Sequence, residues 1–244
     1  MVENTAKFLR NILFIDIETV SQEAHLDALD SRLKQLWLKK ASYFQNVENL
    51  SNEEIYLKRS SIYAEFGKII CIGIGGIFSD DNDELALRVK MIRGETEMEI
   101  LKEFKNILEK HKAGASLMLC AHNGKEFDFP YICRRMLVNE ITLPRVLQVS
   151  GKKPWEINHI DTLDLWKFGD YKNYTSLDLL AAIFDIPGGE TEVSGELIND
   201  IYYKEKDKAK IEQYCAEYIV VLTQLYMKMN NWSLINENNI EVIL

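Results

Sequence analysis

The chain has 244 residues, of which 47% are hydrophobic and 27% charged, and its formal net charge is −9. This composition excludes a disordered chain and is sufficient for one large core. The acidic balance excludes a protein that coats nucleic acid through bulk electrostatics, but not a small site that binds the end of a strand.

No apolar run approaches the roughly 20 residues of a membrane span, and the first ten residues, MVENTAKFLR, lack the apolar segment of a signal peptide. We therefore expect a cytoplasmic protein with no membrane partner. The sequence leaves the oligomeric state open.

The first predicted strand, Ile12–Ile17, contains Asp16 near its end and is followed directly by Glu18. A spacing of two residues on a strand points both side chains to the same face. Neighbouring carboxylates repel each other, and an apolar element accommodates them best when a cation lies between them. The pair is therefore a candidate metal site.

The segment Ser21–Glu65 is rich in charge and has a helical pattern. A segment of this length is not a simple loop in a compact domain, so we predict a helical insertion after the first strand. It is either a plain structural insertion or a lid that contacts substrate through Lys39, Lys40, Lys58 and Arg59.

A second buried strand is predicted over Phe66–Phe78, followed by an acidic turn and an antiparallel return over Leu85–Ile92. The GIGG sequence inside the second strand is not followed by a helix, so it is not a dinucleotide-binding motif. Close packing between strands is the role that we expect for these glycines.

A helix is predicted over Glu95–Lys112, a strand over Ser116–Ala121, and a helix over Phe129–Asn139 that begins near Pro130. This order predicts an α/β fold with a mixed sheet flanked by helices.

Cysteine and histidine side chains show no zinc pattern, because the four cysteines form no CxxC pair and the four histidines have no ligand spacing. We expect the cysteines to pack as small hydrophobic side chains. Any bound metal should therefore be a hard cation held by oxygen.

Three segments in order carry a family resemblance: NILFIDIETV from Asn11, LCAHNGKEFDFPYI from Leu119, and YCAEYIVVLTQLY from Tyr214. They resemble the motifs of the DEDD-type 3′–5′ exonucleases of the ribonuclease-H-like superfamily. The likeness is greatest to predicted exonucleases related to the proofreading domain of family-B DNA polymerases. The resemblance implies a single exonuclease-like domain over residues 1–244, with 21–65 as its insertion, and an enzyme that hydrolyses phosphodiester bonds.

The resemblance also implies a two-ion site for Mg²⁺ or Mn²⁺. By this likeness Asp16 bridges both ions, Glu18 ligates the nucleophile-side ion, and Asp128 ligates the other. Tyr214 orients the attacking water. For Asp128 the alternative is a helix N-cap, and for Tyr214 a core aromatic.

Substrate contacts implied by the resemblance involve Thr19, His122, Asn123 and Phe127. The partner is single-stranded or 3′-terminal nucleic acid. A group of aromatic and basic residues could also stack terminal bases, although such residues are more often core: Trp166, Phe168, Tyr171, Lys172 and Tyr174.

The third motif departs from the family pattern, in which an aspartate follows the tyrosine by four residues, because Tyr218 stands there. A phenol does not replace a carboxylate at neutral pH. Glu217 is a possible substitute ligand, although one residue of helix rotates the side chain by about 100°. Asp161 is another acid in the neighbourhood, and its position favours a helix N-cap.

Two functions follow from this pattern. The first is a metal-dependent 3′–5′ exonuclease with a weakened site. The second is a catalytically inactive pseudo-exonuclease that serves as a nucleic-acid-binding module.

Overall fold

The computed structural model describes residues 2–48, 50–80, 82, 84–170, 174–188 and 193–244. Within them, six strands form one mixed sheet in the order β5-β4-β1-β2-β3-β6. The strands are β1 (Ile12–Ser21), β2 (Gly67–Ser79), β3 (Leu85–Ile92), β4 (Met118–Ala121), β5 (Ile160–Asp161) and β6 (Ile240–Ile243). β2 is antiparallel to β1 and β3, whereas β4, β5 and β6 each run parallel to an inner neighbour.

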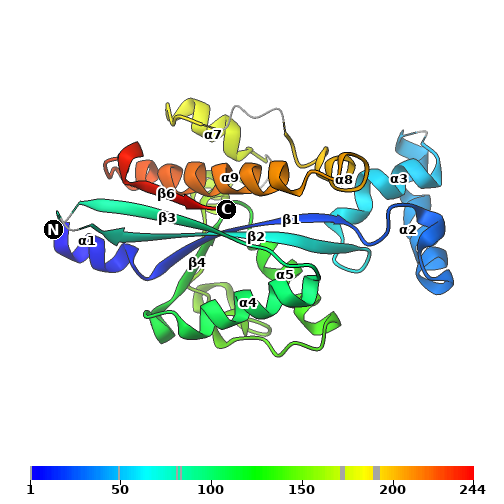
Figure 1. Cartoon of the computed structure of the whole chain (residues 1–244), viewed down its shortest axis with the longest axis horizontal. Coiled ribbons are helices and arrows are strands. Elements are labelled where there is room, and N and C mark those ends of the chain that lie inside the picture. Colours follow the sequence, from blue (N-terminus) through cyan, green and yellow to red (C-terminus); the bar gives the residue numbers. More distant parts are fainter. Residues whose placement is uncertain (1, 49, 81, 83, 171–173, 189–192) are drawn as a thin grey trace.

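Helices cover both faces of the sheet (Figure 1). Their bounds are α1 (Val2–Leu9), α2 (Ser31–Glu48), α3 (Asn52–Arg59), α4 (Glu97–Lys110), α5 (Asp128–Val138), α6 (Thr162–Lys167), α7 (Leu177–Ile183), α8 (Ile198–Asp200) and α9 (Lys208–Met229). The long α9 lies along one face, with α7 outside it, and α4 and α5 lie on the other. In the described part of the chain, no helix combines the length and the apolar character that a membrane crossing requires.

Alternation along β1 divides the core between the two faces. Phe14 packs with the α9 cluster, and its ring lies 5.7 Å from that of Tyr226. Leu13 and Ile15 point the opposite way, into the cluster that includes residues of α4 and α5. Asp16 follows Phe14 by two residues, so its carboxylate lies on the α9 face.

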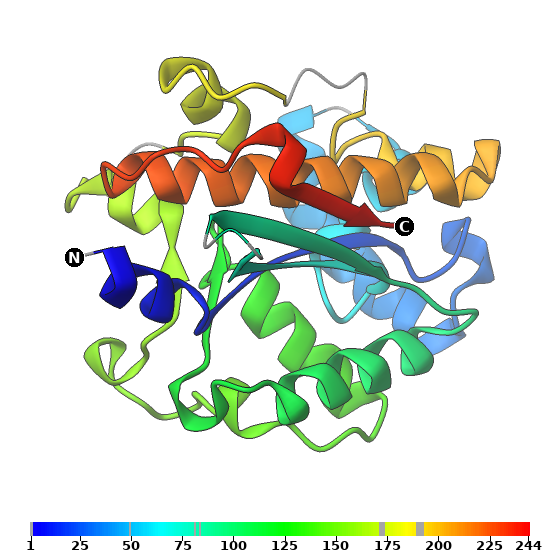
Figure 2. The same cartoon turned by 60° about the vertical axis from the view of Figure 1, so that its left-hand side comes forward.

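The predicted order of strands and helices is confirmed in its main part. The hairpin returns over Leu85–Ile92, and α4, β4 and α5 follow with ends shifted by at most two residues. The segment after β1 contains α2 and α3, which pack around the buried Trp37 in a small core of their own. The prediction missed α1 and the terminal strand β6, which lies beside β3 (Figure 2).

Two glycines of GIGG, Gly73 and Gly75, allow close packing, but their packing partner is the helix α9. A Cβ atom on Gly73 would lie 2.8 Å from Cys215 Sγ, and one on Gly75 would lie 2.6 Å from Ile219 Cγ2. Both contacts belong to α9, so the expectation of packing between strands is corrected. The missing side chains let α9 lie close against β2, next to the acids of β1.

Substitution of Gly75 by Ala is expected to destabilise the protein by about 1–3 kcal/mol, because the new methyl group displaces Ile219. Gly76→Ala is the matched control, since a Cβ there meets nothing within 4 Å. Thermal unfolding of both variants checks this, and equal melting temperatures would show that α9 does not need the gap.

Candidate active site

A cavity of about 390 Å³ opens beside β1, between α5, α7 and α9. Eight of the residues predicted from the sequence line it: Asp16, Glu18, Thr19, His122, Asn123, Phe127, Asp128 and Tyr214. Segments that are more than a hundred residues apart in the chain thus contribute to one cavity.

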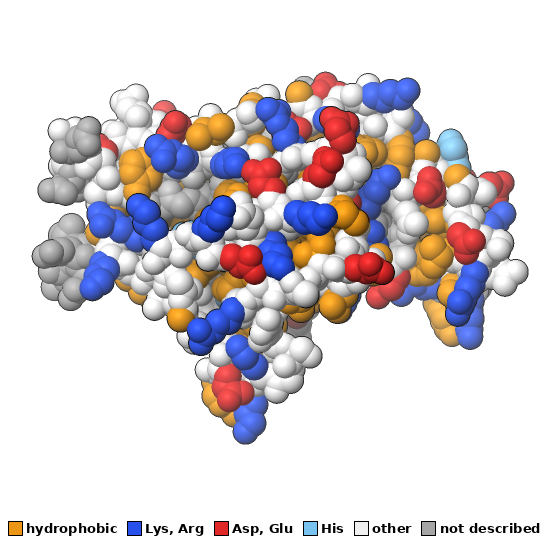
Figure 3. Space-filling view, turned by 60° about the horizontal axis from the view of Figure 1, so that its bottom comes forward, with side chains coloured by type: hydrophobic (Ala, Val, Ile, Leu, Met, Phe, Trp, Pro, Cys, Tyr) orange, Lys and Arg blue, Asp and Glu red, His pale blue; other side chains and the backbone are white. Residues whose placement is uncertain are grey.

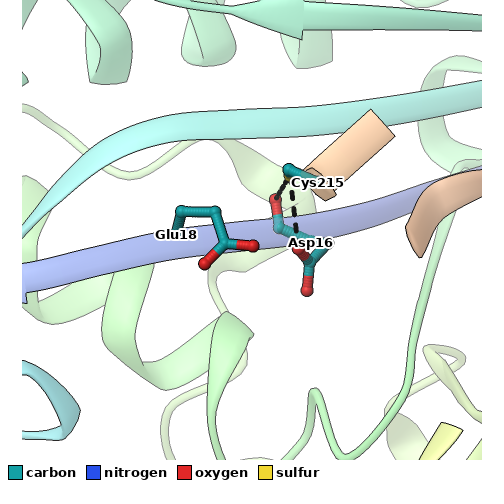
Figure 4. A group of neighbouring side chains, drawn as sticks. All are labelled: Asp16, Glu18 and Cys215. Atoms are coloured by element: carbon teal, nitrogen blue, oxygen red, sulfur yellow. Dashed lines mark hydrogen bonds between the residues drawn. The ribbon is translucent and has the colours of Figure 1, made fainter. Parts of the chain in front are cut away.

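Asp16 and Glu18 project from the same side of β1, and Cys215 reaches them from α9 (Figure 4). One potential ligand atom from each of the three lies within 4.8 Å of the others. The Cys215 thiol lies 3.2 Å from Asp16 Oδ2 and donates a hydrogen bond to it. The pairing of β1 with β2 is irregular directly after Glu18. A bulge of this kind re-aims side chains and is frequent beside active sites.

Asp128 lies in the first turn of α5 and lines the same cavity, but its carboxylate is not among the ligand atoms that lie within 4.8 Å of one another. Its Oδ1 accepts a hydrogen bond of 3.2 Å from the backbone N–H of Ile17, the residue between the two acids of β1. The residue at the N-cap position is Phe127, and no side chain caps the helix there. The alternative of an N-cap role for Asp128 is therefore wrong, because its carboxylate turns toward β1.

Burial raises the pKa of all three carboxyl groups. For Asp16 burial raises the pKa from 3.8 to about 7, while hydrogen bonds with the thiol of Cys215, with Glu18 and with the backbone of Ile17 oppose the rise. The pKa of Glu18 is held well above its usual range by burial and then by the charge of Asp16. The pKa of Asp128 is also held well above its usual range, first by burial and then by the charge of Asp16. A cation among these groups would favour their ionised forms.

The donor set fits a hard divalent cation. The carboxylates of Asp16 and Glu18 lie close together, and that of Asp128 lines the same cavity, so they offer oxygen ligands, the type that Mg²⁺ and Mn²⁺ prefer. The thiol of Cys215 is the softer neighbour, and burial raises its pKa, so it stays protonated and donates to Asp16. It competes with a cation for that oxygen.

Asp161 holds one wall of the cavity in place. Its carboxylate caps α6 by accepting from the N–H groups of Leu163 and Asp164. It also accepts from the N–H groups of Asn123 at 2.9 Å and Lys125 at 3.0 Å. The predicted N-cap role is confirmed, and the same carboxylate fixes the loop in which Asn123 has a left-handed conformation with φ of 61°.

His122 is a structural link rather than a free imidazole. Its Nδ1 lies 2.9 Å from the Thr162 hydroxyl, and its Nε2 lies 2.8 Å from the carbonyl oxygen of Thr175. Burial lowers the pKa of His122, so the ring is neutral, with Nε2–H donating to Thr175 and Nδ1 accepting from Thr162. Both ring nitrogens are thus engaged, although the residue lines the cavity.

The helical insertion reaches the cavity through its last turn, where Ser61 and Ile62 belong to the lining. Thr19 donates its hydroxyl to the carbonyl oxygen of Ser61 at 3.0 Å, and the Tyr131 hydroxyl donates to the same oxygen at 2.8 Å. The candidate phosphate contacts of the insertion are not among the described lining residues: Lys39, Lys40, Lys58 and Arg59. Lys40 lies over the Tyr63 ring and Arg59 over the Phe44 ring.

Tyr214 and Tyr218 extend from α9 into the lining, with ring centroids 6.4 Å apart. Both rings also pack against the α9 core cluster, as the alternative of a core aromatic predicts for Tyr214. Burial raises the pKa of both phenols, which therefore add no negative charge. Glu217 is not part of the lining, and it accepts a hydrogen bond of 2.9 Å from Gln213.

The sequence analysis did not identify two residues of the site, a cysteine that donates to Asp16 and an additional aspartate in the lining. The sequence predicts that Cys215 packs as a small hydrophobic side chain, but its thiol donates to Asp16, and its signal is its place directly after Tyr214 in the third motif. Asp178, an exposed acid in the first turn of α7, also lines the cavity. Its signal in the sequence is weak, since an acid after a serine N-cap is common in any helix.

The proposed stacking group is dispersed. Tyr174 lines the cavity and is 66% exposed, whereas Trp166 packs against Phe184 at the edge of the core. Phe168 is 92% exposed. Tyr171 and Lys172 lie outside the described residues.

Residues 62–238 match a family described as "Predicted 3'-5' exonuclease related to the exonuclease domain of PolB". The fold is similar to the family B DNA polymerase from the hyperthermophilic archaeon Pyrobaculum calidifontis, with a TM-score of 0.54 and 12% identity. That alignment covers 90% of this chain and 24% of the polymerase chain. No curated protein matched the sequence.

The structural likeness, at this low identity, supports the fold alone, a ribonuclease-H-like mixed sheet flanked by helices. The family match carries more, because it spans well over half of the chain. The chain therefore belongs to the family of predicted 3′–5′ exonucleases related to the exonuclease domain of PolB.

Proposed function

We propose that this protein is a divalent-metal-dependent exonuclease that removes nucleotides from 3′ ends, with a site weakened at its third motif. One observation carries the proposal: the carboxylates of Asp16, Glu18 and Asp128 line a single cavity with Tyr214. We further propose that residues 1–244 form one domain, because β6 near the C-terminus joins the same sheet as β1.

In this proposal Asp16, Glu18 and Asp128 hold Mg²⁺ or Mn²⁺. When bound, the cation polarises the scissile phosphate and lowers the pKa of a coordinated water. Tyr214 stays a neutral phenol because burial raises its pKa, so its hydroxyl remains a donor for a water or a phosphate oxygen. The rim supplies Phe127 and the exposed Tyr174 for contact with the terminal nucleotide.

Tyr218 favours a second candidate function, a pseudo-exonuclease that binds strand ends without hydrolysis. It lines the cavity four residues after Tyr214, where the family pattern has an aspartate. Its pKa is held above the usual range by burial and by the charges of Asp16 and Asp128, so it contributes no anionic ligand. A site with one carboxylate fewer balances less of the charge of two divalent ions.

Single-stranded DNA and RNA labelled at the 5′ end test the proposed activity. We expect stepwise shortening from the 3′ end with Mn²⁺, none with a chelator, and a loss of about 10³-fold or more in Asp128→Asn. Asp164→Asn is the control, because it removes only an exposed ion pair with Lys125. Intact substrate at high enzyme concentration, in the wild type and in Tyr218→Asp, would favour the pseudo-exonuclease.

A further inference from the structure

A second hollow, of about 890 Å³, lies between α1, the β2–β3 hairpin and the end of α4. Its described lining residues include six cations and no acid: Lys7, Arg10, Arg88, Lys90, Lys110 and Lys112. The whole chain carries a formal charge of −9, so this hollow is opposite in charge to the molecule as a whole. Figure 3, which brings the α4 side forward, shows Lys and Arg side chains gathered over the half of this face that carries the hairpin.

The hollow faces away from the carboxylate cavity. Gly73 and Gly75 of β2 face α9, because a Cβ on either would meet α9 side chains. Alternate residues of a strand point to opposite faces, and the residues between and beyond them, Ile74 and Gly76, line the hollow. The cations are thus on the sheet face opposite to Asp16.

Much of this charge is not neutralised by the described residues. Arg88 pairs with Glu241 and Lys90 with Glu103, each at 2.6 Å. Arg10 donates to a neutral group, the Ser79 hydroxyl, at 2.8 Å. Lys7, Lys110 and Lys112 form no ion pair with any residue that the structure describes.

The chemistry of the lining favours a phosphate backbone over unstacked bases. Single-strand grooves combine cations with free aromatic faces. Among the described lining residues the sole phenyl, phenol or indole ring is Phe78, and the guanidinium of Arg88 covers it, 4.9 Å from its centroid. Cations without free rings contact the outside of a duplex, where the phosphates are exposed and the bases are stacked inside.

We propose that this basic hollow binds the sugar–phosphate backbone of double-stranded nucleic acid, independently of sequence. The choice of nucleic acid as the polyanion rests on the proposed function. The duplex behind a 3′ end would then be held on one face of the sheet while its terminal nucleotide reaches the cavity on the other.

Gly76 offers a direct test, because it lies in the lining and a Cβ atom there meets nothing within 4 Å. Gly76→Glu places a negative charge among the cations, and Gly76→Gln is its neutral match. Binding is measured by fluorescence anisotropy with a blunt DNA duplex of about two helical turns. Chelator is present throughout, so that hydrolysis does not enter. We expect about tenfold weaker binding for Gly76→Glu and less than about twofold change for Gly76→Gln.

A second variant removes charge instead of adding it. The plot of log K against log salt has a negative slope, with a magnitude of about 0.9 for each phosphate contact. This slope should become less steep by up to about 2.7 in a triple variant that combines Lys7→Gln, Lys110→Gln and Lys112→Gln. Lys153→Gln, Lys206→Gln and Lys228→Gln combined make the same change in net charge outside the hollow and should leave the slope within about 0.5 of the wild type.

Unchanged duplex affinity and slope in both hollow variants would overturn the proposal. Binding to anionic phospholipid vesicles without binding to the duplex would also overturn it, because the hollow would then be a membrane-facing surface. The proposed activity fails separately, since it is measured by shortening of single strands with Mn²⁺. Duplex binding in chelator does not depend on hydrolysis.

Discussion

Replacement of Asp16 by Asn is expected to abolish Mn²⁺ binding and, in metal-free protein, to raise the melting temperature at pH 8. The side chain keeps its shape but loses the charge that burial opposes. A carboxyl group whose pKa rises from 3.8 to about 7 on folding makes the ionised folded state less stable by roughly 4 kcal/mol. Relief of part of this cost corresponds to about 5 °C or more for a chain of this size.

The stability of the metal-free protein should depend on pH, and the direction follows from which state binds more protons. Between about pH 4 and pH 7 the unfolded chain has ionised Asp16 while the folded protein retains the proton, so the folded state binds more protons. Stability of the metal-free wild type should therefore fall as the pH rises through this window, and the variant should lack this contribution. Below about pH 4 the difference from this group disappears.

Calorimetry with Mn²⁺ and melting curves from pH 4 to pH 8 measure both effects. Asp164→Asn serves as a control, because its exposed pair with Lys125 is worth less than about 1 kcal/mol. Unchanged Mn²⁺ affinity in Asp16→Asn would remove this residue from the metal site. A lower melting temperature at pH 8 would show that the hydrogen bond from Cys215 outweighs the burial of the charge.

Replacement of Tyr218 by Asp should strengthen Mn²⁺ binding and raise exonuclease activity by about 10²-fold, equivalent to about 2.7 kcal/mol of barrier. Tyr218 lines the same cavity as Asp16 and Asp128, so a carboxylate there restores the family pattern. Without metal, the variant should be less stable than the wild type at neutral pH. The packing of a partly buried ring is lost, and a fourth acid is added beside three carboxylates.

Tyr218→Asn is the matched variant for this test. It has the same shape as Asp and loses the same packing, but it adds no charge. Stronger metal binding and restored activity in the Asp variant alone would assign the effect to the carboxylate. Equal behaviour of the two variants, both inactive with Mn²⁺, would mean that the chain has lost more than one ligand and would support a binding module.

Local patterns in the sequence were sufficient to predict most of the sheet. The alternating and apolar runs of β1, β2 and β3 predict their strands because each has one clear period and a polar turn beside it. The strand β6 was not predicted, since Ile240–Ile243 is only four residues long and its pairing with β3 depends on contacts more than 150 residues away in the chain.

The acids of the site were predictable because two of them share a strand face and the third lies in a recognisable segment. Their neighbours were not. The approach of Cys215 to Asp16 depends on α9 lying close against Gly73, a tertiary fit that no local pattern records. Likewise, the sequence places Glu217 beside Tyr218, but the turn of α9 directs it toward Gln213 and outside the cavity lining.

The carboxylate of Asp161 ties two parts of the chain into one mechanical unit. Because it accepts from N–H groups of both the Asn123–Lys125 turn and the start of α6, neither part can shift without breaking bonds to the other. A substrate too bulky for the cavity would have to move α6 together with this turn.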